Sequence, residues 1–153
     1  MQNRSVRAGD KITIDVLIKN NPGVWGMDLT VSYDSSMLTL TNVVNGKVFS
    51  ASEWTKSVIN NNKYILSYEA SGFDNVNTNG VLATLEFTVN ENAKVGSSSE
   101  IKTTYNKGDI INSNFEDLNF NTISSKIDII NFIYGDILSL IHISEPTRHL
   151  RIS

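Results

Sequence analysis

A strict alternation of apolar and small or polar residues constrains this chain more than any other feature. It is sharpest in residues 26–34, between a Gly-rich turn and the turn signal Asp34-Ser35-Ser36. A period of two is the period of a β-strand, whose successive side chains point to opposite faces. We therefore predict a strand here with one buried face and one small, polar face. The residues of the buried face are Met27, Leu29, Val31 and Tyr33.

The same pattern recurs along most of the chain before residue 131. The clearest example is residues 81–89, in which every second residue from Val81 to Val89 is apolar. Many short strands with regular turns, and no convincing amphipathic helix, predict an all-β fold: an antiparallel β-sandwich of about nine strands. The other predicted strands are residues 11–20, 38–44, 54–59, 64–68, 101–105, 110–111 and 123–130.

Composition limits the classes of protein to consider. The chain has 153 residues, of which 40% are hydrophobic and 19% charged, which suits one domain with a sizeable core. The net charge of −3 gives no basic surface for nucleic acid. The absence of cysteine excludes disulfides and thiolate zinc sites. No membrane insertion is expected, because the longest apolar stretch contains Asp128 and Asp136.

Three stretches in order resemble the cohesin family, the receptor modules that bind dockerins in cellulosome-type assemblies. They are Ala8-Gly9-Asp10, residues 23–34, and residues 80–89 followed by Ala93 and Gly96. The resemblance covers roughly residues 6–130 and implies a β-sandwich with jelly-roll topology. It also implies a non-catalytic, extracellular module that binds a dockerin domain and so assembles polysaccharide-degrading enzyme complexes. No cofactor is then expected on this chain, since calcium organises the dockerin.

The resemblance further implies a set of dockerin contacts on the flat face of one sheet. Asp28 and Glu69 would accept hydrogen bonds from hydroxyls and cations. Leu66 would supply an apolar anchor, and Gly72 would let the partner backbone come close. Without the resemblance, the better explanation is that the two acids are solvated strand residues. The predicted dockerin-binding residues are Gly26, Asp28, Thr30, Leu66, Glu69 and Gly72.

Aromatic residues leave open an alternative, a carbohydrate-binding or adhesin-type sandwich that would bind polysaccharide. Trp25 and Phe73 lie in predicted loops, where exposed rings could stack on sugars. Trp54 stands at a strand start, a place more typical of a core residue. The aromatic residues considered for such a platform are Trp25, Trp54, Tyr64, Tyr68 and Phe73.

Catalysis and calcium binding have weaker support. The two histidines, His142 and His149, lie in the C-terminal tail, so the body of the domain offers no Ser/His or metal-His site. Residues 75–80 with Glu86 formally fit the spacing of a calcium loop, but the first position is Asn75 and no helix flanks it. An Asn-rich turn before a strand explains these residues without a metal. We therefore expect no enzyme activity and no metal site.

The ends of the chain depart from the strand pattern. We expect residues 1–130 to form the sandwich and residues 131–137 to be a linker, whose last four residues resemble the lead-in to a dockerin calcium loop. Residues 138–153 resemble translated adapter read-through and are expected to be a non-native or disordered tail. The first strand of the family is expected to be truncated, which would leave a sheet edge open. The polar start Met1-Gln2-Asn3-Arg4-Ser5 does not resemble a signal peptide, so none is expected within this fragment.

Overall fold

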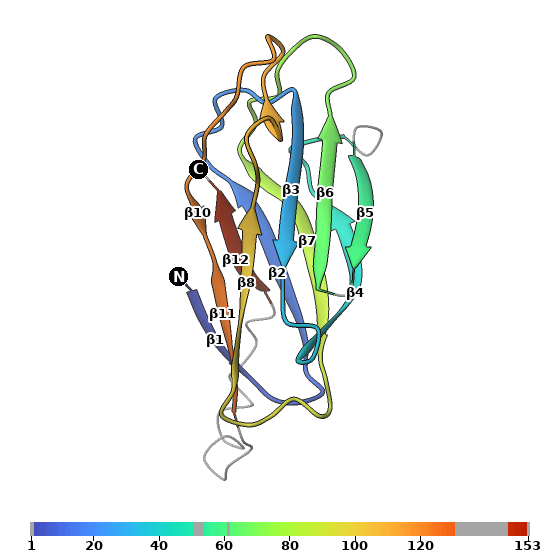
Figure 1. The fold of residues 1–153 in the computed structure, drawn as a ribbon, viewed down its shortest axis with the longest axis vertical. Coiled ribbons are helices and arrows are strands. Elements are labelled where there is room, and N and C mark those ends of the chain that lie inside the picture. The colour runs from blue at the N-terminus through green and yellow to red at the C-terminus, as the bar shows by residue number, and fades with distance from the viewer. Residues whose placement is uncertain (1, 51–53, 61, 131–146, 153) are drawn as a thin grey trace.

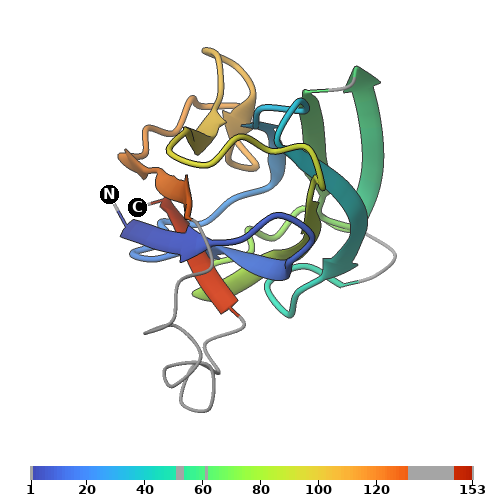
Figure 2. The ribbon, with the colours of Figure 1, turned by 90° about the horizontal axis from the view of Figure 1, so that it is seen from below.

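The computed structural model describes residues 2–50, 54–60, 62–130 and 147–152. These residues form two β-sheets packed face to face as a sandwich (Figure 1; Figure 2). The described ranges contain no helix, and hence none long and apolar enough to cross a membrane. The predicted all-β sandwich is confirmed.

The first sheet has seven strands and faces the viewer in Figure 1. Its order is β1 (Gln2–Val6), β11 (Ser125–Ile129), β8 (Ser98–Thr104), β3 (Gly26–Ser32), β6 (Lys63–Glu69) and β5 (Trp54–Asn60), and β9 (Ile110–Ile111) also pairs with β3. The second sheet lies behind it and has five strands. Its order is β10 (Thr122–Ile123), β12 (Thr147–Ile152), β2 (Lys11–Ile18), β7 (Gly80–Val89) and β4 (Leu38–Asn45).

The pairing corrects the prediction of a purely antiparallel sandwich in one respect. Two strand pairs are parallel, β1 with β11 and β12 with β2, so both sheets are mixed. The predicted last strand, residues 123–130, is also divided. Ile123 belongs to the second sheet and Ser125 begins a strand of the first, so the chain crosses between the sheets at Ser124.

The core fills the space between the two sheets. Alternate residues of the long strands point into it, as Ile12, Ile14, Val16 and Ile18 do in β2, and each is at most 2% exposed. Burying a side chain of this kind contributes about 1.5–3 kcal/mol. The ring of Trp54 packs against the core while remaining partly exposed, in line with the core role considered for it.

The tight contact between β4 and β7 requires a glycine at its end. A Cβ atom on Gly46 would lie 1.8 Å from the carbonyl oxygen of Val81. Here the Gly46 N–H donates to the carbonyl of Leu82 at 2.9 Å, which closes the pairing after β4. Any larger residue would push the two backbones apart.

The sequence predicts a non-native or disordered tail over residues 138–153, and within them residues 147–152 are ordered as a strand. Thr147–Ile152 forms β12, which lies between β2 and β10 in the second sheet. Leu150 and Ile152 are fully buried, and Arg151 between them is partly exposed, which is the alternation of a strand. The expected open edge is therefore not found along β2. Residues 131–146, which include the predicted linker, lie outside the described residues.

Candidate functional site

The pairing of β3 with β6 brings most of the predicted contact residues onto one face. Gly26 is paired with Glu69, Asp28 with Ser67, and Thr30 with Ile65. Directly paired residues share a face of the sheet. Because Met27, Leu29 and Val31 are buried, this shared face is the outer one, turned away from the core. We call it the outer face.

The predicted apolar anchor, Leu66, is not on the outer face, and that part of the prediction is wrong. Leu66 is paired with Leu29, and both side chains are fully buried in the core. A shift of one residue along a strand moves a side chain to the opposite face of the sheet. The apolar residue that does lie on the outer face is its neighbour Ile65, which is half-buried beside Thr30.

Asp28 is held at the middle of the outer face by two elements. Its carboxylate accepts a hydrogen bond from the hydroxyl of Ser67 on β6. Its backbone N–H donates to the carbonyl of Asp109 at 2.8 Å, just before β9. The carboxylate is exposed and keeps further acceptor positions for a partner's donors. Sequence reasoning missed Ser67, although it alternates with Glu69 on the same strand.

The two glycines of the predicted set have different surroundings. A Cβ atom on Gly26 would lie 3.5 Å from Ile111 of β9, which is an ordinary van der Waals contact. A Cβ atom on Gly72 would meet nothing within 4 Å. The carbonyl of Gly72 accepts a hydrogen bond from the indole N–H of Trp25 at 2.6 Å. Gly72 thus lies in an open position next to Trp25, beyond the end of β6.

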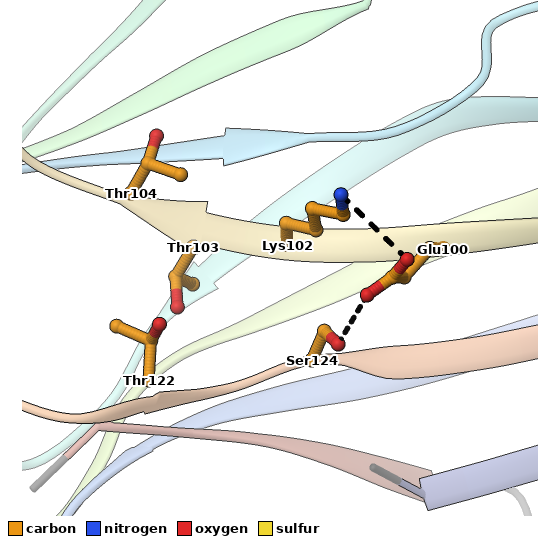
Figure 3. A pocket seen from close by; sticks show the side chains of 6 residues that line it. All are labelled: Glu100, Lys102, Thr103, Thr104, Thr122 and Ser124. Atoms are coloured by element: carbon orange, nitrogen blue, oxygen red, sulfur yellow. Dashed lines mark hydrogen bonds and ion pairs between the residues drawn. The ribbon is translucent and has the colours of Figure 1, made fainter.

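A polar hollow lies beside β8, on the edge of that strand away from β3, where β10 and β11 diverge (Figure 3). The hydroxyl of Ser124 donates to Glu100 Oε1 at 2.6 Å, and Lys102 Nζ lies 3.6 Å from Glu100 Oε2. The Ser124 hydrogen bond, helped by Lys102 and Lys126, holds the pKa of Glu100 below its usual value. The hollow has a volume of about 250 Å³ and is lined by Glu100, Lys102, Thr103, Thr104, Thr122 and Ser124.

The oxygens of the Asn-rich loop weighed as a calcium site are engaged by neighbouring loops. The described part of the chain contains no group of three or more His, Cys, Asp and Glu side chains able to hold a metal ion. In the loop weighed as a calcium site, Asn75 Oδ1 accepts the N–H of Ser113 at 2.7 Å, and Asn79 Oδ1 accepts that of Asn21 at 2.9 Å. These oxygens therefore tie neighbouring loops together.

The aromatic residues considered for a sugar platform are divided between core and surface. Tyr64 and Tyr68 are buried, at 2% and 4% exposed, and cannot stack on a ligand. Phe73 is 90% exposed. The ring of Trp25 contacts Phe115 edge-on, with 5.6 Å between centroids and 75° between planes. Sequence reasoning missed Phe115, which lies in a polar loop with no recognisable motif.

Comparison with solved structures identifies the class of this fold. A cohesin of Acetivibrio cellulolyticus in complex with a dockerin is 22% identical, with a TM-score of 0.70 over 85% of this chain and 95% of that one. A cohesin–dockerin complex of Clostridium thermocellum gives 20% identity and a TM-score of 0.71 over 84% and 95%. A non-cellulosomal cohesin of the archaeon Archaeoglobus fulgidus gives 17% and 0.71 over 94% of each chain. The fold is that of the cohesin jelly-roll sandwich.

The family is established by the sequence itself. The family model described as the cohesin domain matches residues 1–134, which is most of the chain. No curated protein matches the sequence closely enough to count as a relative. This chain belongs to the cohesin family, whose members are non-catalytic binding modules.

Proposed function

We propose that this protein is a dockerin-binding module without enzyme activity, and that it binds through the outer face of β3 and β6. One observation carries the proposal. The register of β3 with β6 places Asp28, Ser67 and Glu69 on a single sheet face, next to the half-buried Ile65. The structures in which related folds hold a dockerin support the choice of partner.

The outer face suits a partner that presents hydroxyls and cations. The carboxylates of Asp28 and Glu69 are exposed acceptors, and hydrogen bonds to charged acceptors are the stronger kind. Both sit on strands fixed by a continuous backbone ladder, so little ordering of this chain is needed on binding. Ile65 takes the role of apolar anchor that the sequence assigned to Leu66.

The proposed setting is the extracellular assembly of polysaccharide-degrading enzymes. The dockerin would carry the calcium, and this chain would need no cofactor of its own. Calcium dependence of binding would then belong entirely to the partner. The carbohydrate-binding alternative is less well supported, because Tyr64 and Tyr68 are inside the core.

Calorimetric titration of the full chain against a small panel of dockerins, with calcium and with chelator, tests the proposal. We expect calcium-dependent binding at submicromolar strength, roughly −8 kcal/mol or better. Asp28→Ala and Glu69→Ala should each weaken it while the melting temperature stays unchanged. Asp128→Ala is a matched control, because Asp128 lies on the same sheet in β11, away from β3 and β6. Folded protein that binds no dockerin would contradict the proposal.

A further inference from the structure

We infer that three aromatic residues at one end of the sandwich form the apolar end of the dockerin-binding surface. They are Trp25, Phe73 and Phe115, and we call them the aromatic cluster. The loops that carry them lie at the upper end of the sandwich in Figure 1. The inference rests on the proposed function and adds to it a second, apolar region of contact beyond Asp28 and Glu69.

The backbone at Trp25 joins the aromatic cluster to the ends of β3 and β6. Trp25 directly precedes Gly26, the first residue of β3, and its carbonyl accepts the N–H of Ala70 at 2.8 Å, just after Glu69. Its backbone N–H donates to Ile111 at 2.8 Å. A partner that lies along β3 and β6 and extends past Gly26 would therefore reach the aromatic cluster.

The position of Phe115 is fixed by its own turn. Its φ is +62°, a left-handed conformation that a bulky side chain seldom adopts. The turn is closed by Asn112, whose Oδ1 accepts the N–H groups of Asn114 at 3.0 Å and Glu116 at 3.1 Å. The Phe115 N–H donates to the Asn112 carbonyl at 2.9 Å. The ring is thus held 72% exposed over Trp25 before any partner arrives.

The chemistry of the cluster favours a protein partner. Exposed aromatic side chains are the usual anchors of protein interfaces, and the outer face otherwise presents mainly small polar residues. Among the described residues the exposed large hydrophobic side chains are Val44, Phe73, Val95 and Phe115, and the two aromatic ones are here. The planes of Trp25 and Phe115 are 75° apart, so these rings do not form the flat platform that a sugar ring needs.

Three substitutions test the inference by calorimetry with the dockerin that binds best in the titration above. Phe73→Ser removes the most exposed ring. Phe115→Asn removes the second ring with a residue that tolerates φ > 0, so the turn is kept. Val95→Ser is the matched control, since Val95 is 54% exposed in the loop between β7 and β8. We expect each phenylalanine variant to bind tenfold or more weakly, with unchanged melting temperature, and the control to bind as the wild type.

A spectroscopic measurement reports contact directly. The chain has two tryptophans, so in a Trp54→Phe background Trp25 is the only tryptophan, and its emission is excited selectively over that of the tyrosines. Saturation with dockerin should shift its emission to shorter wavelength and reduce quenching by acrylamide. The inference would be overturned if the emission of Trp25 did not shift and if Phe73→Ser and Phe115→Asn bound dockerin with wild-type affinity. The proposed function would still stand in that case.

Other occupants of the cluster give different results. If the wild type binds no dockerin, the proposed function fails and this inference fails with it. If the phenylalanine variants lose retention on insoluble polysaccharide but keep their dockerin affinity, the cluster is a sugar site and the inference is wrong. It is equally wrong if these variants abolish a concentration-dependent dimer and bind dockerin normally.

Discussion

Ile65 and Leu66 are neighbours in the sequence but lie on opposite sides of the first sheet. Leu66 is fully buried opposite Leu29, whereas Ile65 is half-buried on the outer face opposite Thr30. Substituting these two residues, which are nearly equal in hydrophobicity and volume, should therefore affect the protein in different ways. Truncating the inner one leaves a cavity, and changing the outer one alters only the surface.

This difference gives a prediction for a pair of variants. Leu66→Ala should lower the free energy of unfolding by about 2–5 kcal/mol and leave the dockerin affinity of the folded fraction unchanged. Ile65→Ser should leave stability nearly unchanged and weaken dockerin binding about tenfold, or about 1.4 kcal/mol. Urea unfolding and calorimetry measure the two quantities separately. Loss of affinity in Leu66→Ala with full stability would reverse our assignment of faces.

At this scale the sequence predicts the face of a residue only where the alternation is clean. In β3, apolar and polar residues alternate without exception, and the outward position of Asp28 and Thr30 followed from it. In β6, apolar residues occupy three consecutive positions, Tyr64, Ile65 and Leu66, so either phase of the strand was compatible with the pattern. Only the pairing with β3 decides between them.

At the scale of elements, β12 joins β10 to the rest of the second sheet. It pairs with β2 over six residues and with β10 over two, and so separates those two strands. The carbonyl of Ile152 accepts the N–H of Lys19 at 2.9 Å. Without β12, the β2 edge would expose an unpaired backbone and the apolar side chains now covered by Leu150 and Ile152.

We predict that β12 contributes to stability as a core strand does. Leu150→Ala should lower the free energy of unfolding by about 2–5 kcal/mol. It should also speed hydrogen exchange at the Lys19 amide, which reports the loss of its bond to Ile152. Arg151→Ala, at the partly exposed position between the two buried ones, should change stability by no more than about 0.5 kcal/mol. Equal, negligible effects of both substitutions would show that the C-terminal stretch adds nothing to the fold.

Sequence reasoning found the strands that have a strong internal pattern and missed those defined by their neighbours. β2, β3 and β7 were predicted because each shows several alternating apolar residues. β12 has only Leu150 and Ile152, and β1 has only Val6 as an apolar core residue, so neither shows a period by itself. Both are strands because a long, regular partner offers them hydrogen bonds.

At the scale of the whole molecule, the core contains three tyrosines that bear on stability at high pH, because burial raises the pKa of Tyr33, Tyr64 and Tyr68. Burial raises the pKa of Tyr64 to about 12, and burial with the proximity of Tyr64 raises that of Tyr68 further. Tyr68 donates its hydroxyl proton to the carbonyl of Leu82 at 2.8 Å, and its ring stacks on Phe49. Among the described residues, the hydroxyl of Tyr64 has no hydrogen-bond partner.

These raised pKa values predict how the free energy of unfolding changes at alkaline pH. In the unfolded chain a tyrosine loses its proton near pH 10, so above that pH the unfolded state binds fewer protons than the folded one. The contribution of these tyrosines to the free energy of unfolding should therefore be constant below about pH 10. It should fall as pH rises toward 12. Urea unfolding at several pH values, with tyrosinate absorbance, measures both effects.

Tyr64→Phe is the control for this pH dependence. It removes one titrating group and a buried hydroxyl without a partner, so it should reduce the slope above pH 10. At neutral pH it should be neutral or more stable by about 1 kcal/mol. An unchanged slope would show that Tyr64 ionises as easily in the folded protein as in the unfolded chain.

The parallel pairing of β1 with β11 has a mechanical consequence. Five residue pairs join the two strands, from Gln2 with Ser125 to Val6 with Ile129, and the Ile130 N–H extends the ladder to Val6. Because the strands run in the same direction, tension applied between Gln2 and Ile130 slides one strand along the other. All the ladder hydrogen bonds then share the load at once, whereas a hairpin pulled at its open end yields one bond at a time. A domain built in this way resists tension applied between Gln2 and Ile130, while the proposed binding face on β3 and β6 keeps its shape.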